Sequence, residues 1–335
     1  MRLGTSLSGV WNHFSPPRWL VLVSAALLAS VAFAAKPGGG GGGTGPGGVV
    51  YFSYTGGLWS MSGNDGFGKT QLNMEGNPSE RTYGGRRWFL QRRSPADGVV
   101  ETWAVRDDGA EQLLPVDMDL ETTFWWGPGD VLVGIGRRWM LDGNVDPTSC
   151  GVYLADIEFD AAGDIVSYVP PALYAPLDVI VDDEGQAQVD IRWGCDISPD
   201  LTRLVQTRVS GPGLWVTDLL TGDSQQITTE GASLPVWSPA GNVIAFESSL
   251  ETYGSIATIN VDGTNRHALV RVSWREWVSI VGWSPSGSHL AYHTTSKEFT
   301  KNIPDEIYRI SVTGGDKVNL TADIGGWYGN VIWRQ

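Results

Sequence analysis

A short phrase of the form Trp-Ser-Pro-x-Gly occurs twice in the sequence, at residues 237–241 and 283–287. Ser at the first position of a four-residue turn, Pro at the second and Gly at the fourth are favoured in type I turns, because Pro presets φ and Ser bonds the local backbone. Alternating apolar residues follow each turn, which is the period-2 pattern of a strand. Each phrase therefore predicts two strands joined by a tight turn.

Both stretches continue with further strand and turn signals. Residues 256–259 lead into an Asp-Gly pair at 262–263, and residues 307–310 lead into a Gly-Gly pair at 314–315. Such pairs are typical of hairpins, and a short strand pattern follows each of them. Each stretch thus predicts four antiparallel strands, and the equivalent tryptophans are about 46 residues apart. Four-stranded units with a period of this length are typical of β-propeller blades.

Weaker copies of the unit begin near residues 84, 126 and 196. A partial unit of three strands starts at residue 49, and residues 329–333 resemble the first strand that it lacks. A blade assembled from both ends of the chain would remove the open edge strands of a ring. The sequence therefore predicts an all-β fold: a six-bladed β-propeller of four-stranded antiparallel blades, closed by the C-terminal strand, over residues 49–335.

The repeated units resemble the Tol-B-like β-propeller repeats of bacterial exported proteins. That pattern consists of Trp-Ser-Pro-Asp-Gly, a strand, an aromatic strand, Asp-Gly, and a short strand ending in Leu-Thr. The last three units match it well, the first matches in its second half, and the second and third are diverged. The periplasmic Tol-B protein has an α/β domain before its propeller, whereas a glycine-rich segment stands there in this chain. The resemblance implies an exported bacterial propeller.

The N-terminal segment has the composition of an export signal. Residues 1–18 contain two arginines and no acid, and residues 19–34 are apolar and end in Ala-Phe-Ala, as at a signal cleavage site. We therefore expect a signal peptide at 1–34, a Gly-rich tether at 35–48, and a mature chain that is periplasmic or secreted. The alternative is an uncleaved membrane anchor, although the apolar run is short for a full span.

The charge of the chain bears on its partners. The 335 residues carry a formal net charge of −14 at pH 7. This sign disfavours nucleic acids and anionic membranes as partners, because both attract basic surfaces. After residue 34 the sequence has no further apolar run long enough to span a membrane. We expect a monomer whose partner is an envelope protein or a glycan.

The sequence offers little for catalysis or metal binding. The turn at Ser284 has the wrong spacing for the Gly-x-Ser-x-Gly nucleophile of hydrolases. His289 and His293 would lie about 13 Å apart along one strand, which is too far for both to bind one metal ion. We therefore predict no catalytic residues, no metal ligands and no cofactor, with Ca²⁺ held by surface carboxylates as the alternative.

Long connections gather on one face of the predicted propeller, which we call the long-loop face. They join strand 2 to strand 3 of a blade, or strand 4 to the next blade, and the longest covers residues 170–192 with a hairpin signal of its own. Elaborated loops on a rigid scaffold commonly carry binding sites, although neutral drift of surface loops is an alternative. Two groups of charged residues are expected to meet on this face and to form a binding site: Arg92, Arg93, Arg137, Arg138, Asp117, Asp119 and Glu121. They could hold an acidic partner or Ca²⁺, or neutralise one another.

These features favour a non-catalytic binding or scaffold protein of the bacterial cell envelope, which binds a protein or a glycan through the long-loop face. The alternative is a propeller enzyme of the lyase, glycosidase or lactonase type that acts on an extracellular or envelope saccharide. Tyr or carboxylate side chains that converge on a central pocket would favour the enzyme.

The two cysteines, Cys150 and Cys195, would lie in an oxidising compartment after export, where disulfides form. Cys150 closes a connection of the third unit, and Cys195 enters the first strand of the fourth. Both are therefore expected on the long-loop face of neighbouring blades, close enough to form a disulfide. The alternative is two unpaired, buried thiols.

Overall fold

The structure is a computed structural model of the chain, in which most of the residues after 46 are described. The described ranges are 47–54, 57–72, 81–84, 87–93, 100–105, 110–114, 120–126, 131–161, 164–169, 171–250, 254–273, 276–296, 305–315, 317–324 and 328–334. No helix in these ranges is long and apolar enough to cross a membrane. The predicted signal peptide, and the predicted tether as far as residue 46, lie outside the described residues.

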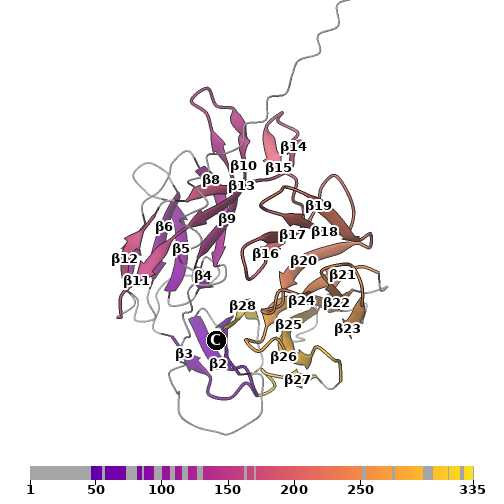
Figure 1. The fold of residues 1–335 in the computed structure, drawn as a ribbon. Helices are drawn as coiled ribbons and strands as arrows, with labels where there is room; N and C mark the ends of the chain where they lie inside the picture. Colours follow the sequence, from indigo (N-terminus) through magenta and orange to yellow (C-terminus); the bar gives the residue numbers. More distant parts are fainter. Residues whose placement is uncertain are drawn as a thin grey trace, which may run out of the picture. The chain divides into compact units, whose positions relative to one another are not determined.

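Six antiparallel sheets of four strands account for most of the described residues. Three of these sheets use consecutive strands of the C-terminal half, and Figure 1 shows them following one another. Their strands are β16 (Cys195–Ile197), β17 (Arg203–Thr207), β18 (Leu214–Asp218) and β19 (Ser224–Thr228); β20 (Ala232–Trp237), β21 (Val243–Ser248), β22 (Ser255–Asn260) and β23 (His267–Arg271); and β24 (Glu276–Trp283), β25 (His289–Ser296), β26 (Glu306–Ser311) and β27 (Val318–Asn319). The four-stranded units predicted from the repeat are confirmed here.

Two further sheets lie in the N-terminal half. One consists of β4 (Arg81–Gly84), β5 (Arg87–Arg93), β6 (Val100–Val105) and β7 (Glu111–Leu113). The other has the order β13-β10-β9-β8 and consists of β8 (Leu120–Trp126), β9 (Leu132–Trp139), β10 (Val145–Ala155) and β13 (Ala172–Pro176). Two hairpins adjoin its fourth strand: β11 (Ile157–Phe159) with β12 (Ile165–Tyr168), and β14 (Val179–Val181) with β15 (Ala187–Val189). The predicted connection at 170–192 thus contains the hairpin expected there, but also the fourth strand of a sheet.

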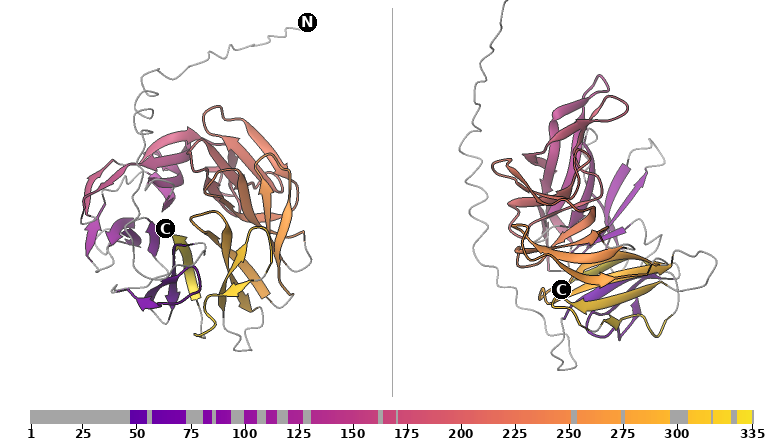
Figure 2. Two further views of the ribbon diagram at one scale, coloured as in Figure 1. Left: turned by 60° about the horizontal axis from the view of Figure 1, so that its bottom comes forward. Right: turned by 90° about the vertical axis from the view of Figure 1, so that its right-hand side faces the viewer.

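The last sheet joins the two ends of the described chain. The C-terminal strand β28 (Tyr328–Arg334) pairs with β1 (Val49–Tyr54), which is followed by β2 (Gly57–Ser62) and β3 (Thr70–Gln71). Val50 lies opposite Trp333 in this antiparallel pair. In Figure 2 the yellow C-terminal strand lies beside the indigo N-terminal strands. The C-terminal strand therefore supplies the strand that the first unit lacks.

The repeated Ser-Pro turn is built in the same way in the three C-terminal sheets. The serine hydroxyl accepts a hydrogen bond from the backbone N–H five residues further along the chain. The pairs are Ser198 with Arg203 at 2.9 Å, Ser238 with Val243 at 3.1 Å, and Ser284 with His289 at 3.0 Å. The buried hydroxyl thus holds the start of the second strand against the turn.

The fourth residue of each of these turns has a positive φ. The angle is +69° at Gly241 and +70° at Gly287, where a side chain would be strained. In the third copy the position is taken by Leu201, which adopts a φ of 61°. Leu201 packs against an apolar cluster that its own sheet forms with the β8–β13 sheet. This packing accompanies a backbone conformation that is unfavourable for leucine.

The repeated tryptophan links one sheet to the preceding one. The indole of Trp237, at the end of β20, donates to the carbonyl oxygen of Asp196 in β16 at 3.0 Å. The indole of Trp283, at the end of β24, donates to the carbonyl oxygen of Val236 in β20 at 3.1 Å. Both side chains are buried. These two tryptophans therefore link neighbouring sheets.

Apolar clusters join successive sheets of the described structure. Five such clusters are described, and each contains residues of two successive sheets. In order from the β4–β7 sheet, they include Leu114 with Leu132, Val152 with Ile197, Val205 with Phe246, Ala245 with Tyr292, and Ala291 with Phe52. The last of them joins the β24–β27 sheet to the sheet of the two chain ends.

Candidate functional site

A pocket of about 830 Å³ opens among the β16–β19, β20–β23 and β24–β27 sheets. Its walls come from the residues before β16, the start of β20, the end of β21, and the starts of β22 and β24. The connections at these positions run from strand 2 to strand 3 of a sheet or from strand 4 to the next sheet. The pocket therefore lies on the long-loop face, and its size suits a small ligand or a side chain of a partner.

Glu247, near the end of β21, is the acidic side chain in the wall of this pocket. Its Oε2 accepts a hydrogen bond from the hydroxyl of Ser233 at 3.1 Å. Its Oε1 is buried and has no hydrogen-bond partner in the described part of the chain. Burial raises the pKa of Glu247, and polar groups of Ser279, Ser233 and Ile280 partly oppose this rise. The pocket thus contains a carboxylate with unused accepting capacity.

Two tryptophans lie at the mouth of the pocket. Trp193, just before β16, is 51% exposed, and Trp277, in β24, is 61% exposed. The guanidinium of Arg192 lies 3.9 Å from the ring centroid of Trp193, which is a cation–π contact. The backbone N–H of Leu234 donates to the carbonyl oxygen of Trp193 at 2.9 Å and so ties the start of β20 to this segment. Exposed aromatic rings around a cavity are typical of binding sites.

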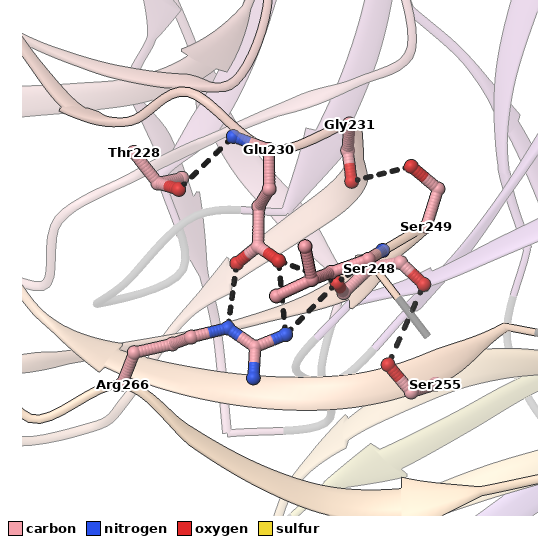
Figure 3. Close-up of polar contacts among 8 residues, drawn as sticks. Thr228, Glu230, Gly231, Ser248, Ser249, Ser255 and Arg266 are labelled. Carbon is pink, nitrogen blue, oxygen red and sulfur yellow. Dashed lines mark hydrogen bonds and ion pairs between the residues drawn. The ribbon is translucent and has the colours of Figure 1, made fainter. Parts of the chain in front are cut away.

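An ion pair next to the pocket holds its wall in place (Figure 3). Arg266 donates from Nε to Oε1 of Glu230 at 2.7 Å and from Nη2 to Oε2 at 2.9 Å. Arg266 Nη2 also donates to the hydroxyl of Ser248 at 3.0 Å, and this hydroxyl donates to Glu230 Oε2 at 2.8 Å. The side chain of Glu230 is only 6% exposed. A buried bidentate pair of this kind fixes the β19–β20 connection to the end of β21.

The same wall is closed by contacts of Ser249. Its hydroxyl donates to the carbonyl oxygen of Gly231 at 3.1 Å, and its backbone N–H donates to the same oxygen at 2.9 Å. A Cβ at Gly231 would lie 2.1 Å from the Ser249 hydroxyl. A side chain at position 231 would therefore displace Ser249 from the pocket wall.

Solved structures resemble this chain at low sequence identity. TolB from Acinetobacter baumannii superposes with a TM-score of 0.52 at 14% identity, over 85% of this chain and 66% of that protein. The chain has a TolB-like β-propeller fold. It thus spans just under two thirds of the length of that TolB protein.

Other propellers give weaker superpositions. A putative TolB from Agrobacterium tumefaciens has a TM-score of 0.49 at 14% identity, over 88% of this chain and 100% of the other. An oligogalacturonate lyase in complex with manganese has a TM-score of 0.38 at 18% identity, over 71% of this chain and 73% of the other. No family model matches the sequence, and no curated protein matches it.

Part of the charge cluster predicted from the sequence lies outside the described structure. Asp117 and Asp119 are not among the described residues. Arg92 and Arg93 end β5 of the propeller and lie opposite residues 101 and 100 of β6, but their side chains are not described. Whether these four residues bind a partner stays a prediction.

Arg137 has a partner that the sequence did not predict. Its Nη1 donates to the carbonyl oxygen of Ala187 at 2.9 Å and lies 3.5 Å from Oδ2 of Asp182. Both groups belong to the β14–β15 hairpin, so Arg137 holds this hairpin against β9. Glu121, on β8, lies opposite Arg137 in the strand register. Backbone hydrogen bonds in the hairpin turn, and to a smaller extent Arg137, lower the pKa of Asp182.

Arg138 contacts residues of β10 instead. Its guanidinium lies 5.8 Å from the ring centroid of Tyr153, and its backbone N–H donates to the hydroxyl of Ser149 at 2.7 Å. The described contacts of Arg137 and Arg138 are thus with β10 and the hairpin. Neither residue lines the pocket described above.

The predicted Cys150–Cys195 disulfide is wrong for this structure, because both cysteines are free. Cys150 does not close a loop as expected but lies inside β10, in an irregular stretch of its pairing with β9, where it is fully buried. Cys195 begins β16 and packs against the apolar cluster there. Burial raises the pKa of both thiols, that of Cys195 to about 12. The alternative of two unpaired thiols in the core is the one observed.

His293 lies close to a buried acid. His293 Nε2 lies 3.5 Å from Oδ2 of Asp305, whose side chain is buried. Burial lowers the pKa of His293, and Asp305 partly opposes this shift. The side chain of His293 is only 18% exposed. In the ranges that the structure describes, no group of three His, Cys, Asp or Glu residues is placed to hold a metal ion.

The sequence did not predict the residues that line the pocket. Trp193 and Trp277 lie outside the repeated phrase, and this irregular placement was the one available signal. Glu247 sits in an alternating strand pattern that only indicates a sheet face. Its approach to Trp193 and Trp277, from other sheets, depends on how the sheets pack.

Proposed function

We propose that this chain is an exported, non-catalytic binding protein of the bacterial cell envelope, which holds a protein or glycan partner in the pocket on the long-loop face. The observation that carries the proposal is the pocket itself, an aromatic-rimmed cavity of about 830 Å³ with a partly unpaired carboxylate. The export signal expected at residues 1–34 and the TolB-like fold support the location.

The scaffold in this proposal is a closed six-bladed propeller. The six four-stranded sheets would each form one blade, and the pairing of β28 with β1 would close the ring. Closure of this kind protects the edge strands that a linear array of sheets would expose. A rigid ring would hold the pocket walls, which come from three sheets, in one arrangement.

Binding is favoured over glycoside hydrolysis by the composition of the pocket wall. Glycosidases generally use two carboxyl groups on opposite sides of the scissile bond. Among the described residues that line the pocket, Glu247 is the one acid. A single carboxyl with a raised pKa could donate a proton, but the second group of such a mechanism is missing from this wall.

Site-specific photo-crosslinking in the native envelope tests the proposal. A photoreactive residue at position 277, in the mouth of the pocket, should capture a partner that is then identified by mass spectrometry. The same residue at position 220, in the exposed β18–β19 turn, is the matched control and should capture nothing. Binding of the purified partner should weaken in Trp277→Ala and not in Leu220→Ala. Equal weakening, or turnover of a glycan or lactone that is lost in Glu247→Gln, would contradict a non-catalytic role for the pocket.

A further inference from the structure

We infer that the pocket binds the charged end of a basic side chain, the ammonium of a lysine or the guanidinium of an arginine, presented by a partner polypeptide. The features that point to this are Glu247, the acidic side chain among the residues that line the pocket, and a mouth flanked by Trp193 and Trp277. The inference rests on the proposed function, because it names the chemistry that the same pocket would recognise.

The serine hydroxyls in the pocket wall already use their protons within the protein. Four serine hydroxyls line the pocket, and each donates to an acceptor of the protein itself. The pairs are Ser233 to Glu247 Oε2, Ser248 to Glu230 Oε2, Ser249 to the Gly231 carbonyl, and Ser255 to the Ser248 carbonyl. These hydroxyls therefore have no proton left to donate to a ligand. An anion or a carbonyl group, which needs hydrogen-bond donors, is poorly matched to them.

The charge of the pocket points the same way. A cation held beside the Glu247 carboxylate would form a charge-assisted hydrogen bond, which is stronger than a bond from a neutral donor. Arg192 also lines the pocket, but its guanidinium lies against the Trp193 ring at the mouth. The chain as a whole carries a net charge of −14, which attracts basic ligands.

The apolar walls suit the stem of a long basic side chain. Ala232, Leu234 and Val278 also line the cavity. Lysine and arginine carry three or four methylene groups below the charge, and these bury well along apolar surface. The tryptophan rings at the mouth would contact the stem or the charged group itself, as Trp193 already contacts Arg192. A neutral sugar would leave the carboxylate without a counter-charge.

Glu247 must be ionised to pair with a cation, so binding is expected to depend on pH. Burial raises the pKa of its carboxyl, and a bound cation would favour the ionised form, so affinity should increase as the pH rises. The groups that face it are Ser233 from β20, and Ser279 and the Ile280 N–H from β24; Arg192 also lines the pocket, with its guanidinium on the Trp193 ring. The neighbouring Glu230–Arg266 pair is already mutually satisfied.

The test uses the mature full chain and two blocked pentapeptide amides, one with a central lysine among glycines and one with norleucine in its place. Binding is measured by calorimetry and by tryptophan fluorescence, since Trp193 and Trp277 flank the pocket. The lysine peptide should bind at least about tenfold more tightly than the norleucine peptide, and Glu247→Gln should remove this difference. Glu158→Gln removes the same charge from exposed β11 and is the control that should bind like the wild type.

The pH series adds a second readout. Affinity for the lysine peptide should rise between about pH 5 and about pH 8 in the wild type and stay flat in Glu247→Gln. Equal binding of both peptides, no binding of the lysine peptide at millimolar concentration, or an unchanged Kd in Glu247→Gln would overturn the inference. A glycan or an uncharged peptide that loses affinity in Trp277→Ala but not in Glu247→Gln would overturn it as well, while leaving the proposed binding function standing.

Discussion

The β20–β23 and β24–β27 sheets contact their neighbours differently from the β8–β13 sheet. In the first two, a buried tryptophan at the end of the inner strand donates to a backbone carbonyl of the preceding sheet. In the β8–β13 sheet, an inserted hairpin contacts the preceding sheet: Gln112 Nε2 donates to the Ile165 carbonyl oxygen at 3.2 Å, and Ile165 packs in one cluster with Leu114. Units that keep the repeated sequence therefore contact the preceding sheet through the same residue in each unit. A diverged unit makes such contacts through inserted segments.

The sheet of the two chain ends has neither a complete repeat nor an insertion, and deleting residues 330–335 should have the largest effect. The deletion removes most of β28 and the buried Trp333, and it leaves β1 as an open edge. We expect the free energy of unfolding to fall by about 5 kcal/mol or more, measured by urea denaturation. Removal of Gln335 alone, beyond β28, is the control. An unchanged midpoint after the longer deletion would show that the fold does not need this strand.

The tryptophan link can be tested within one strand. Trp283→Ala should destabilise the chain by about 3–5 kcal/mol, because the side chain is buried and its indole bonds the neighbouring sheet. Trp277→Ala, at an exposed position of the same strand, should change stability by less than about 0.5 kcal/mol. Urea titrations of both variants decide this, and similar losses would mean that the link between sheets is not what distinguishes Trp283.

The Ser-Pro turn should contribute less than the tryptophan. Ser284→Ala removes a buried acceptor of the His289 N–H, so we expect a loss of about 1–3 kcal/mol in thermal or urea unfolding. Ser286→Ala changes an exposed residue of the same turn and should stay within about 0.5 kcal/mol of the wild type. If Ser286→Ala cost as much as Ser284→Ala, the hydroxyl bond across the turn would not be the cause.

In the diverged unit, breaking the Arg137 contacts should act locally. Arg137→Gln removes the ion pair with Asp182 and weakens the tie between β9 and the β14–β15 hairpin. We expect faster amide hydrogen exchange at residues 187–189 and almost no change in the global unfolding midpoint, because inserted segments open independently of the core. Cooperative loss of the whole fold would show that the hairpin is part of the core.

The smallest expected effect is on the pH dependence of stability. Glu247 has a raised pKa in the folded chain, so between its unfolded and folded pKa values the folded state binds more protons and stability falls as the pH rises. Glu247→Gln removes this term, and the variant should gain stability relative to the wild type as the pH is raised through that window. Urea midpoints over a pH series measure the difference, and parallel curves for the two proteins would contradict the shift.

The amino-acid sequence by itself determined the units of this fold. The Ser-Pro turns, the strand pattern after each of them and the period between the tryptophans are local signals, because turn and strand formation depend on neighbouring residues. They predicted the three C-terminal sheets, the hairpin at 179–189 and the pairing of the last strand with the first. They also located the long-loop face, on which the pocket lies.

Only the tertiary structure decided which side chains meet on that face. Glu247, Trp193 and Trp277 come from three different sheets, and their approach depends on how these sheets pack against one another. The same holds for Arg137, which the sequence assigned to a charge cluster and the structure pairs with Asp182, and for the two cysteines, which are free thiols. Spacing along a chain specifies which strand a residue belongs to, but distances between strands of different sheets are set by long-range packing that no local pattern encodes.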